Sequence, residues 1–120
     1  MKLTILGSGS CVPSLKRSSP SNFLQTSNKK IIVDFGAGTL HQLLKANIDY
    51  KEIDCVFITH FHNDHIGELH AFLNALNNTP NFNRKKELTL VGPIGFKNFY
   101  KKIINSKPRP NTFKIKIKET

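Results

Sequence analysis

The sequence predicts an α/β fold in which parallel strands are joined by a helix. Short apolar runs alternate with segments whose apolar residues recur at helical spacing. One run, Cys55 to Ile58, is continuously apolar, as is typical of a buried parallel strand. The chain has 120 residues, of which 38% are hydrophobic and 22% charged, so we expect one ordered domain with a small core.

The first elements are predicted to be strands. Lys2 to Leu6 is an apolar run that Gly7-Ser8-Gly9-Ser10 ends. Asn22 to Thr26 and Lys30 to Val33 are two further runs, separated by three residues that favour a turn. We expect these two runs to pair as a hairpin.

A helix is predicted from Thr39 to Ala46, because Leu40, Leu43 and Leu44 share one helical face. Thr39 is a candidate N-cap residue. The strand at Cys55 to Ile58 follows. A strand, a helix and a second strand in this order predict a right-handed βαβ unit.

The second half is predicted to continue as helices and strands. A helix is expected from Ile66 to Leu76, a strand from Leu88 to Val91, and a basic amphipathic helix from Phe96 to Ile104. Strict alternation over Phe113 to Lys118 predicts a half-buried edge strand. The apolar stripes of the two helices are Leu69, Phe72, Leu73 and Leu76, and Phe96, Phe99, Tyr100 and Ile103.

Composition narrows the partners and the compartment. The net charge of +10, from 18 Lys+Arg against 8 Asp+Glu, favours an anionic small molecule or a nucleic acid as substrate. The alternative is that the segment from Lys97 to Lys118, which holds much of the charge, is a solvated face. Cys11 and Cys55 form no C-x-x-C pair, and we interpret Cys55 as a buried, reduced thiol. No apolar stretch reaches membrane-spanning length, so we expect a cytoplasmic protein with no membrane partner.

The chemistry is concentrated in the segment His60-Phe61-His62-Asn63-Asp64-His65, which holds three imidazoles and one carboxylate. Zinc accepts this set of nitrogen and oxygen ligands. Two zinc ions roughly 3.5–4 Å apart can share a hydroxide that attacks an ester. The alternative is a His-rich surface loop without metal. The position after a strand and before an amphipathic helix favours the metal site, because ligands gather at the carboxyl ends of strands in such sheets.

The His-x-His-x-Asp-His pattern resembles that of the metallo-β-lactamase superfamily. Three other segments are similar to its ribonuclease Z-like branch, namely Leu6-Gly7-Ser8-Gly9, Asp34-Phe35-Gly36-Ala37-Gly38-Thr39 and Leu90-Val91-Gly92-Pro93. The resemblance covers nearly the whole chain. It implies that residues 1–120 form the N-terminal half of a four-layer αββα sandwich whose C-terminal half is absent.

The resemblance also implies roles for individual residues. His60 and His62 would hold a first zinc ion, and Asp64 and His65 a second, with Mn²⁺ or Fe²⁺ as alternative metals. Asp64 would in addition be the catalytic residue that handles a proton. Asp34 would support the metal loop from outside the ligand set; the alternative is an ordinary turn residue before Gly36.

The same family completes its site with a His, a bridging Asp and a final His from later segments. Here no His follows His70 and no Asp follows Asp64, so half of the ligand set is present. We therefore expect the chain to need its C-terminal half, with a homodimer as a further option.

The predicted function is metal-dependent hydrolysis of a phosphodiester by a zinc-bound hydroxide. The alternatives are a hydrolase of another ester or lactone, or a truncated, non-catalytic metal-binding chain. Gly36-Ala37-Gly38-Thr39-Leu40-His41 and Gly67-Glu68-Leu69-His70 differ from the patterns of the tRNA-processing enzymes, which favours a different hydrolase substrate. We interpret His41, Glu68 and His70 as solvated helix residues.

Overall fold

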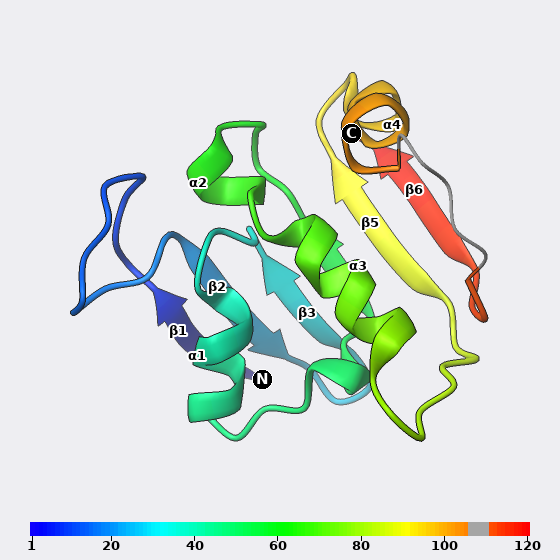
Figure 1. Cartoon of the computed structure of the whole chain (residues 1–120), viewed down its shortest axis with the longest axis horizontal. Coiled ribbons are helices and arrows are strands. Elements are labelled where there is room, and N and C mark those ends of the chain that lie inside the picture. Colours follow the sequence, from blue (N-terminus) through cyan, green and yellow to red (C-terminus); the bar gives the residue numbers. More distant parts are fainter. Residues whose placement is uncertain (106–110) are drawn as a thin grey trace.

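In the computed structural model, which describes residues 1–105 and 111–120, six strands form one sheet in sequence order (Figure 1). The strands are β1 (Lys2–Gly7), β2 (Ser21–Gln25), β3 (Lys30–Val33), β4 (Cys55–Phe57), β5 (Leu88–Gly92) and β6 (Ile115–Glu119). The helices are α1 (Thr39–Lys45), α2 (Asn63–Ile66), α3 (Leu69–Asn78) and α4 (Phe96–Phe99), with a 3₁₀ turn, η1 (Tyr50–Glu52), and a π-helical segment, η2 (Tyr100–Ile104).

The strand directions divide the sheet into two parts. β1, β2 and β3 pair antiparallel, so the predicted hairpin is confirmed. β3, β4, β5 and β6 pair parallel, which confirms the strand–helix–strand unit around α1. β6 lies at the edge of the sheet, as its alternating sequence predicted. The carboxyl ends of four parallel strands therefore meet at one edge, where the histidine segment follows β4.

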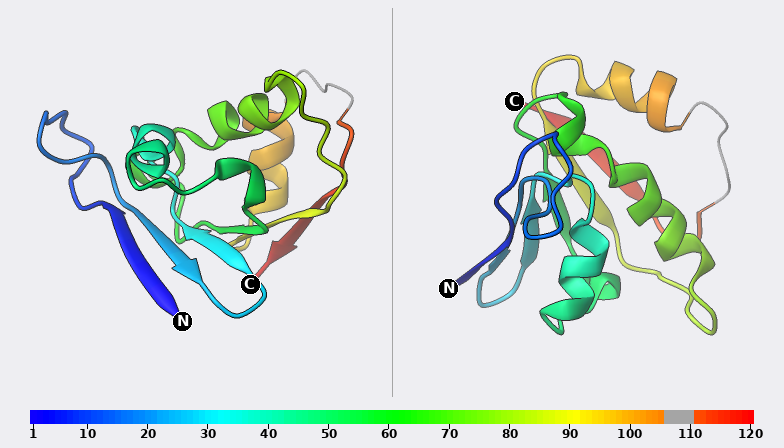
Figure 2. Two further views of the ribbon diagram at one scale, coloured as in Figure 1. Left: turned by 90° about the horizontal axis from the view of Figure 1, so that it is seen from below. Right: turned by 60° about the vertical axis from the view of Figure 1, so that its left-hand side comes forward.

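The core lies between the sheet and the helices, which all cover the same face (Figure 2). Alternation along the strands places Phe23, Ile32, Val56 and Leu90 in one row across β2 to β5, and all four are buried. The helices contribute a second set of buried residues, namely Leu43, Leu69, Phe72, Leu73 and Leu76. This burial of apolar surface is the main favourable contribution to folding.

Two details of the predicted helices are corrected near the histidine segment. The helix predicted over Ile66 to Leu76 is two helices, α2 and α3, separated at Gly67 and Glu68. The break arises because the Glu68 N–H donates to the Phe35 carbonyl outside the helix (3.0 Å). Thr39 is the first residue of α1 and not its N-cap, which is Gly38 at a φ of 92°. The Thr39 hydroxyl donates instead to the Gly36 carbonyl (2.7 Å).

The helix predicted over Phe96 to Ile104 changes type midway. It is α-helical to Phe99 and π-helical from Tyr100, where the Asn105 N–H donates to the Tyr100 carbonyl (2.7 Å). A π turn holds one extra residue and therefore rotates the following side chains. As a result Ile104 is buried and Ile103 is 62% exposed, which corrects the predicted apolar stripe.

The opposite face of the sheet is apolar over β1, β3 and β4 and carries Lys116 and Lys118 on β6. It has no helix over it in the described part of the chain (Figure 2). One row of paired residues crosses this face from β1 to β5 and consists of Ile5, Asn22, Val33, Phe57 and Val91. Ile5 is 66% and Phe57 43% exposed, so β4 is not buried on both faces as its apolar run suggested. An exposed apolar face of this kind favours association.

Cys55 also lies on this face and is half-buried rather than buried, and both cysteines are free. Burial raises the pKa of the Cys55 thiol, and the nearby ammonium groups of Lys118 and Lys29 only partly oppose this effect. The thiol therefore stays protonated at neutral pH and is a poor nucleophile.

None of the helices within the described ranges is long and apolar enough to cross a membrane.

Arg84, which the sequence did not single out, holds the loops at the amino ends of the parallel strands. Its side chain is buried, and its guanidinium donates to the carbonyls of Lys51, Ile53, Lys86 and Glu87 at 2.8–3.2 Å. The same group lies over the Phe113 ring at 5.3 Å. Arg84 thus replaces secondary structure as the hydrogen-bond partner of four carbonyls.

We predict that Arg84→Met destabilises the fold, because buried carbonyls without donors cost about 1–3 kcal/mol each. The expected loss in the free energy of unfolding is at least about 2 kcal/mol, measured by urea denaturation. Lys85→Met is the control, because Lys85 is the exposed neighbour. Equal midpoints for the two variants would show that the buried guanidinium does not stabilise these loops.

We also predict that the open face makes the isolated chain associate. Ile5→Lys places a charge on this face and should lower the associated fraction measured by light scattering, with an unchanged circular dichroism spectrum. Ile94→Lys is the control, because Ile94 is 83% exposed but lies outside the sheet. Association that persists undiminished in the Ile5 variant, or falls as much in the Ile94 variant, would argue against a role for the open face.

Candidate metal centre

The histidine segment follows β4 at the carboxyl ends of the parallel strands: residues 60–62 form a loop, and Asp64 and His65 lie in α2. Two backbone hydrogen bonds fix its start: the Ile58 N–H donates to the Val91 carbonyl (2.7 Å), and the Asp34 N–H donates to the Phe57 carbonyl (2.7 Å). The loop is thereby held to the neighbouring strands on both sides. Ordered parallel strands are the reason that this short polar segment has a defined position.

The loop brings the three imidazoles together. The ring centroids of His60 and His62 are 4.7 Å apart, and those of His60 and His65 are 4.0 Å apart. Asp64 lies beside them, with Oδ2 at 3.5 Å from Nε2 of His65. His60, Asp64 and His65 are half-buried, while His62 is exposed. The four residues predicted as ligands therefore lie in one cluster.

Asp34, which follows β3, is the buried centre of the hydrogen bonds under this cluster. Its carboxylate contacts Nδ1 of His65 at 2.6 Å and accepts from both the backbone N–H and the hydroxyl of Thr59 at 2.8 Å. Its backbone φ is 64°, in the left-handed region that Asp and Asn tolerate better than most residues. The structure thus places Asp34 in contact with His65 and Thr59, and its role in supporting metal ligands stays a prediction.

These contacts orient two imidazoles in the same way. The single hydroxyl proton of Thr59 goes to Asp34, so the hydroxyl oxygen is free to accept from Nδ1 of His60 (2.9 Å). His65 donates from Nδ1 directly to Asp34. The network therefore assigns a proton to Nδ1 in both rings, and in the neutral form of each ring the lone pair is on Nε2. A neutral imidazole whose other nitrogen is held by an outer partner is the usual form of a metal ligand.

Gly36 allows the turn after β3 to lie against α2. A Cβ at this position would be 2.0 Å from the Asp64 carbonyl oxygen and 2.5 Å from Cβ of Ser19. Phe35 beside it donates its N–H to the His65 carbonyl (2.7 Å). Only a glycine fits this close backbone approach.

The donor types fit zinc, but the donors do not converge on one point. Among the residues that the structure describes, no group of three or more His, Cys, Asp or Glu side chains is arranged to hold a metal ion. The chain thus supplies oriented nitrogen and oxygen donors without a closed coordination shell.

Sequence reasoning missed three residues of this region. Glu68, interpreted as a solvated helix residue, is half-buried, and its carboxylate accepts the N–H groups of Gly38 (2.7 Å) and Leu40 (2.8 Å). Thr59 joins His60 to Asp34, although only its place before the motif marked it. Phe61 stacks on Phe99, with centroids 5.0 Å apart and rings 6° from parallel, and so fixes the loop to α4.

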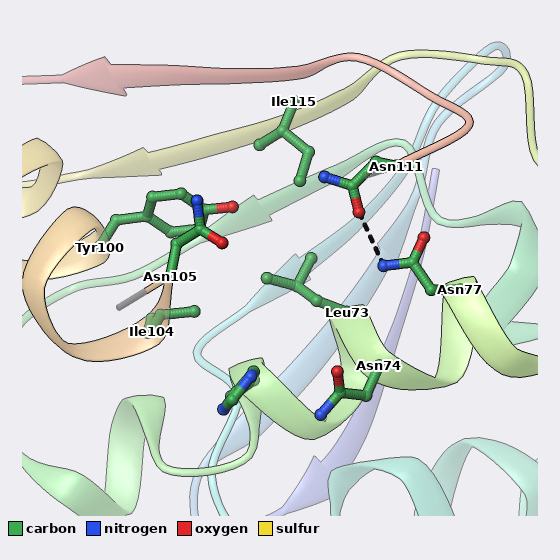
Figure 3. A pocket seen from close by; sticks show the side chains of 9 residues that line it. Leu73, Asn74, Asn77, Tyr100, Ile104, Asn105, Asn111 and Ile115 are labelled. Carbon is green, nitrogen blue, oxygen red and sulfur yellow. Dashed lines mark hydrogen bonds between the residues drawn. The ribbon is translucent and has the colours of Figure 1, made fainter. Parts of the chain in front are cut away.

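Other polar residues lie outside the cluster. His41 and His70 are exposed on α1 and α3, as predicted. His70 lines a small pocket between α3, η2 and β6 that is rich in amides, including Asn77 and Asn111, which bond to each other (2.7 Å; Figure 3). None of residues 59–65 lines this pocket.

Comparison with known proteins identifies relatives of this arrangement. Residues 1–100 match the family model described as anti-Pycsar protein Apyc1. The ribonuclease Z of Pediococcus pentosaceus is 37% identical over 122 residues, which cover 99% of this chain and 39% of that protein. The chain therefore spans about two-fifths of the length of this curated relative.

Solved structures agree in fold. The short form of human tRNase Z superposes with a TM-score of 0.83 at 27% identity, over 99% of this chain and 44% of that chain. Zn²⁺-bound PqqB of Methylobacterium extorquens superposes with a TM-score of 0.64 at 14% identity, over 96% of this chain and 45% of that one. The described sheet and helices thus correspond to part of each larger structure.

We predict that Asp34→Asn weakens zinc binding about 10–100-fold, because an outer hydrogen-bond partner of metal ligands is changed while the ligands remain. Asn tolerates the left-handed backbone at this position, which makes it a better substitution than Ala. Isothermal titration with zinc measures the effect. Asp49→Asn, an exposed change outside the cluster, is the control. Unchanged affinity in a folded Asp34 variant would show that Asp34 does not support the ligands.

Proposed function

The chain belongs to the Apyc1 anti-Pycsar family and has the ribonuclease Z-like sequence and metallo-β-lactamase fold, and from this we propose that it forms the metal-binding part of a phosphodiesterase. The observation that supports the proposal most is the network around Asp34. The network holds Nδ1 of His60 and of His65, so Nε2 of each ring is left for a metal ion, and the Asp64 carboxylate lies beside His65. Such pre-oriented donors serve no evident purpose in packing the core.

In this proposal His60 and His62 hold one zinc ion, and Asp64 and His65 hold a second. Bound zinc would supply a Lewis acid and a water that ionises near neutral pH. Asp64 is the catalytic residue that would accept a proton from this water, because its carboxylate is half-buried beside the imidazoles. Asp34 and Thr59 keep the imidazoles in the tautomer that binds metal.

The proposed substrates are anionic phosphodiesters. The net charge of +10 favours their approach. We place a cyclic nucleotide before a precursor tRNA for two reasons: the matching family model is that of Apyc1, and residues 36–41 and 67–70 differ from the patterns of the tRNA-processing enzymes. The alternative substrate is a carboxylic ester or a lactone, and the activity test below distinguishes it from a phosphodiester.

Turnover is proposed for a protein in which further segments supply the remaining ligands. The chain spans 39% of the Pediococcus relative, and no three donors converge in the described residues. Misplacement of reacting groups by 1 Å can cost about 100-fold in rate. The chain alone should therefore bind metal weakly and be a poor catalyst.

We expect purified chain to bind zinc, and the double variant His60→Ala/His62→Ala to lose most of it, as measured by elemental analysis. His41→Ala/His70→Ala is the matched control, because it removes two exposed histidines outside the cluster. Equal metal content in the wild type and the cluster variant would contradict the metal site.

Activity is tested with bis(p-nitrophenyl) phosphate, a cyclic nucleotide and p-nitrophenyl acetate, on this chain and on a chain continued past Thr120. We expect the continued chain to hydrolyse the phosphodiesters at least about 100-fold faster than this chain. Hydrolysis of the acetate alone would refute the phosphodiesterase proposal, and equal rates would show that the added segments are not needed.

A further inference from the structure

We propose that Glu68 is a positioning residue for the metal loop, because its carboxylate fixes the turn before α1 and through it the contact between Asp34 and His65. The inference rests on the proposed function for the role of His65 as a ligand. It assigns no contact of Glu68 with metal or substrate.

Glu68 belongs to a pair of segments, residues 34–40 and 64–68, that are joined by several hydrogen bonds. Two of the hydrogen bonds are between backbone groups, from the Phe35 N–H to the His65 carbonyl (2.7 Å) and from the Glu68 N–H to the Phe35 carbonyl (3.0 Å). A third contact joins Asp34 to Nδ1 of His65 (2.6 Å). The candidate ligand His65 is thus held at one end of this pair.

The Glu68 carboxylate closes the other end. One oxygen accepts the Gly38 N–H (2.7 Å), and the other accepts the Leu40 N–H (2.8 Å). These N–H groups lie at the start of α1, where a helix provides no partner of its own. Hydrogen bonds to an ionised acceptor are about twice as strong as those between neutral groups. The side chain therefore makes the capping hydrogen bonds that the N-cap Gly38, which has no side chain, cannot make.

The geometry between the two ends leaves little freedom. At Gly36, an added Cβ would be only 2.0 Å from the Asp64 carbonyl oxygen, so the two backbones are already in contact. Phe35 bonds to both His65 and Glu68, and Asp34 precedes it. If the turn at Gly38 were released, Phe35 and Asp34 would lose one restraint on their position relative to His65, and the Asp34 N–H bond to the Phe57 carbonyl would remain. Glu68 thus acts on the ligand through the backbone of residues 34–38.

A purely stabilising cap predicts a different result, because its removal would lower stability without changing the His65 ring. The chain offers a matched comparison. Glu119 accepts the N–H groups of Gly95 (2.8 Å) and Lys97 (3.0 Å) at the start of α4 with one carboxylate oxygen. It therefore makes the same number of hydrogen bonds at another helix, away from residues 34–40.

The experiment measures the His65 imidazole by NMR in metal-free wild type, Glu68→Ala, Glu68→Gln and Glu119→Ala, and then titrates each protein with zinc. We expect Glu68→Ala to move the His65 Nδ1 signal away from the hydrogen-bonded position and to weaken zinc binding about 10-fold. Glu68→Gln should lie between, because its amide oxygen can still accept one N–H. Glu119→Ala should leave the His65 Nδ1 signal as in the wild type, because α4 contacts the histidine segment through Phe61 and Glu119 makes its bonds to Gly95 and Lys97.

Two results would overturn the inference: a His65 signal that is unchanged in the Glu68 variants, or an equal change in Glu119→Ala. If Glu68→Ala does not fold, the Gln variant gives the same decision. If the wild type binds no zinc, the proposed function fails. The metal-free His65 signal then decides alone whether Glu68 positions this ring.

Discussion

The candidate site depends on one buried carboxylate. Asp34 contacts His65 directly and His60 through the Thr59 hydroxyl, so a single anion orients two imidazoles that belong to a different segment of the chain. A buried carboxylate is tolerated only when its oxygens are fully hydrogen-bonded. Asp34 meets this requirement with the groups that the site needs to orient. The stability of the buried carboxylate and the orientation of the candidate ligands therefore have the same physical origin.

The features that could be predicted from sequence are those that depend on near neighbours. Short apolar runs bounded by turn residues predicted β1, β2 and β3. Alternation of side chains predicted β6, because a strand repeats every two residues whatever lies around it. The spacing of Leu69, Phe72, Leu73 and Leu76 predicted the buried face of α3 for the same reason. The histidine cluster was predictable because its members are adjacent in sequence and follow a strand whose carboxyl end faces the site.

The features that escaped prediction join residues far apart in the chain. Glu68 is 30 residues from Gly38, and Arg84 is 31 residues from Ile53, so no local pattern marks either as a partner. A Glu on a helix and an Arg in a loop are usually solvated, and only the folded chain shows that these two are not. The π turn at Tyr100 escaped for a related reason. A single extra residue in a turn leaves no periodic signal over so short a helix.

The open face of the sheet has a thermodynamic consequence. Unfolding raises the heat capacity by about 12–15 cal/mol/K per residue in ordinary domains, because it brings apolar surface into water. In this chain Ile5 and Phe57 are already 66% and 43% exposed in the folded state. Less new apolar surface is therefore hydrated on unfolding. The stability curve of the monomer should be flatter with temperature than that of a closed domain of equal length, and its curvature should increase when the face is covered.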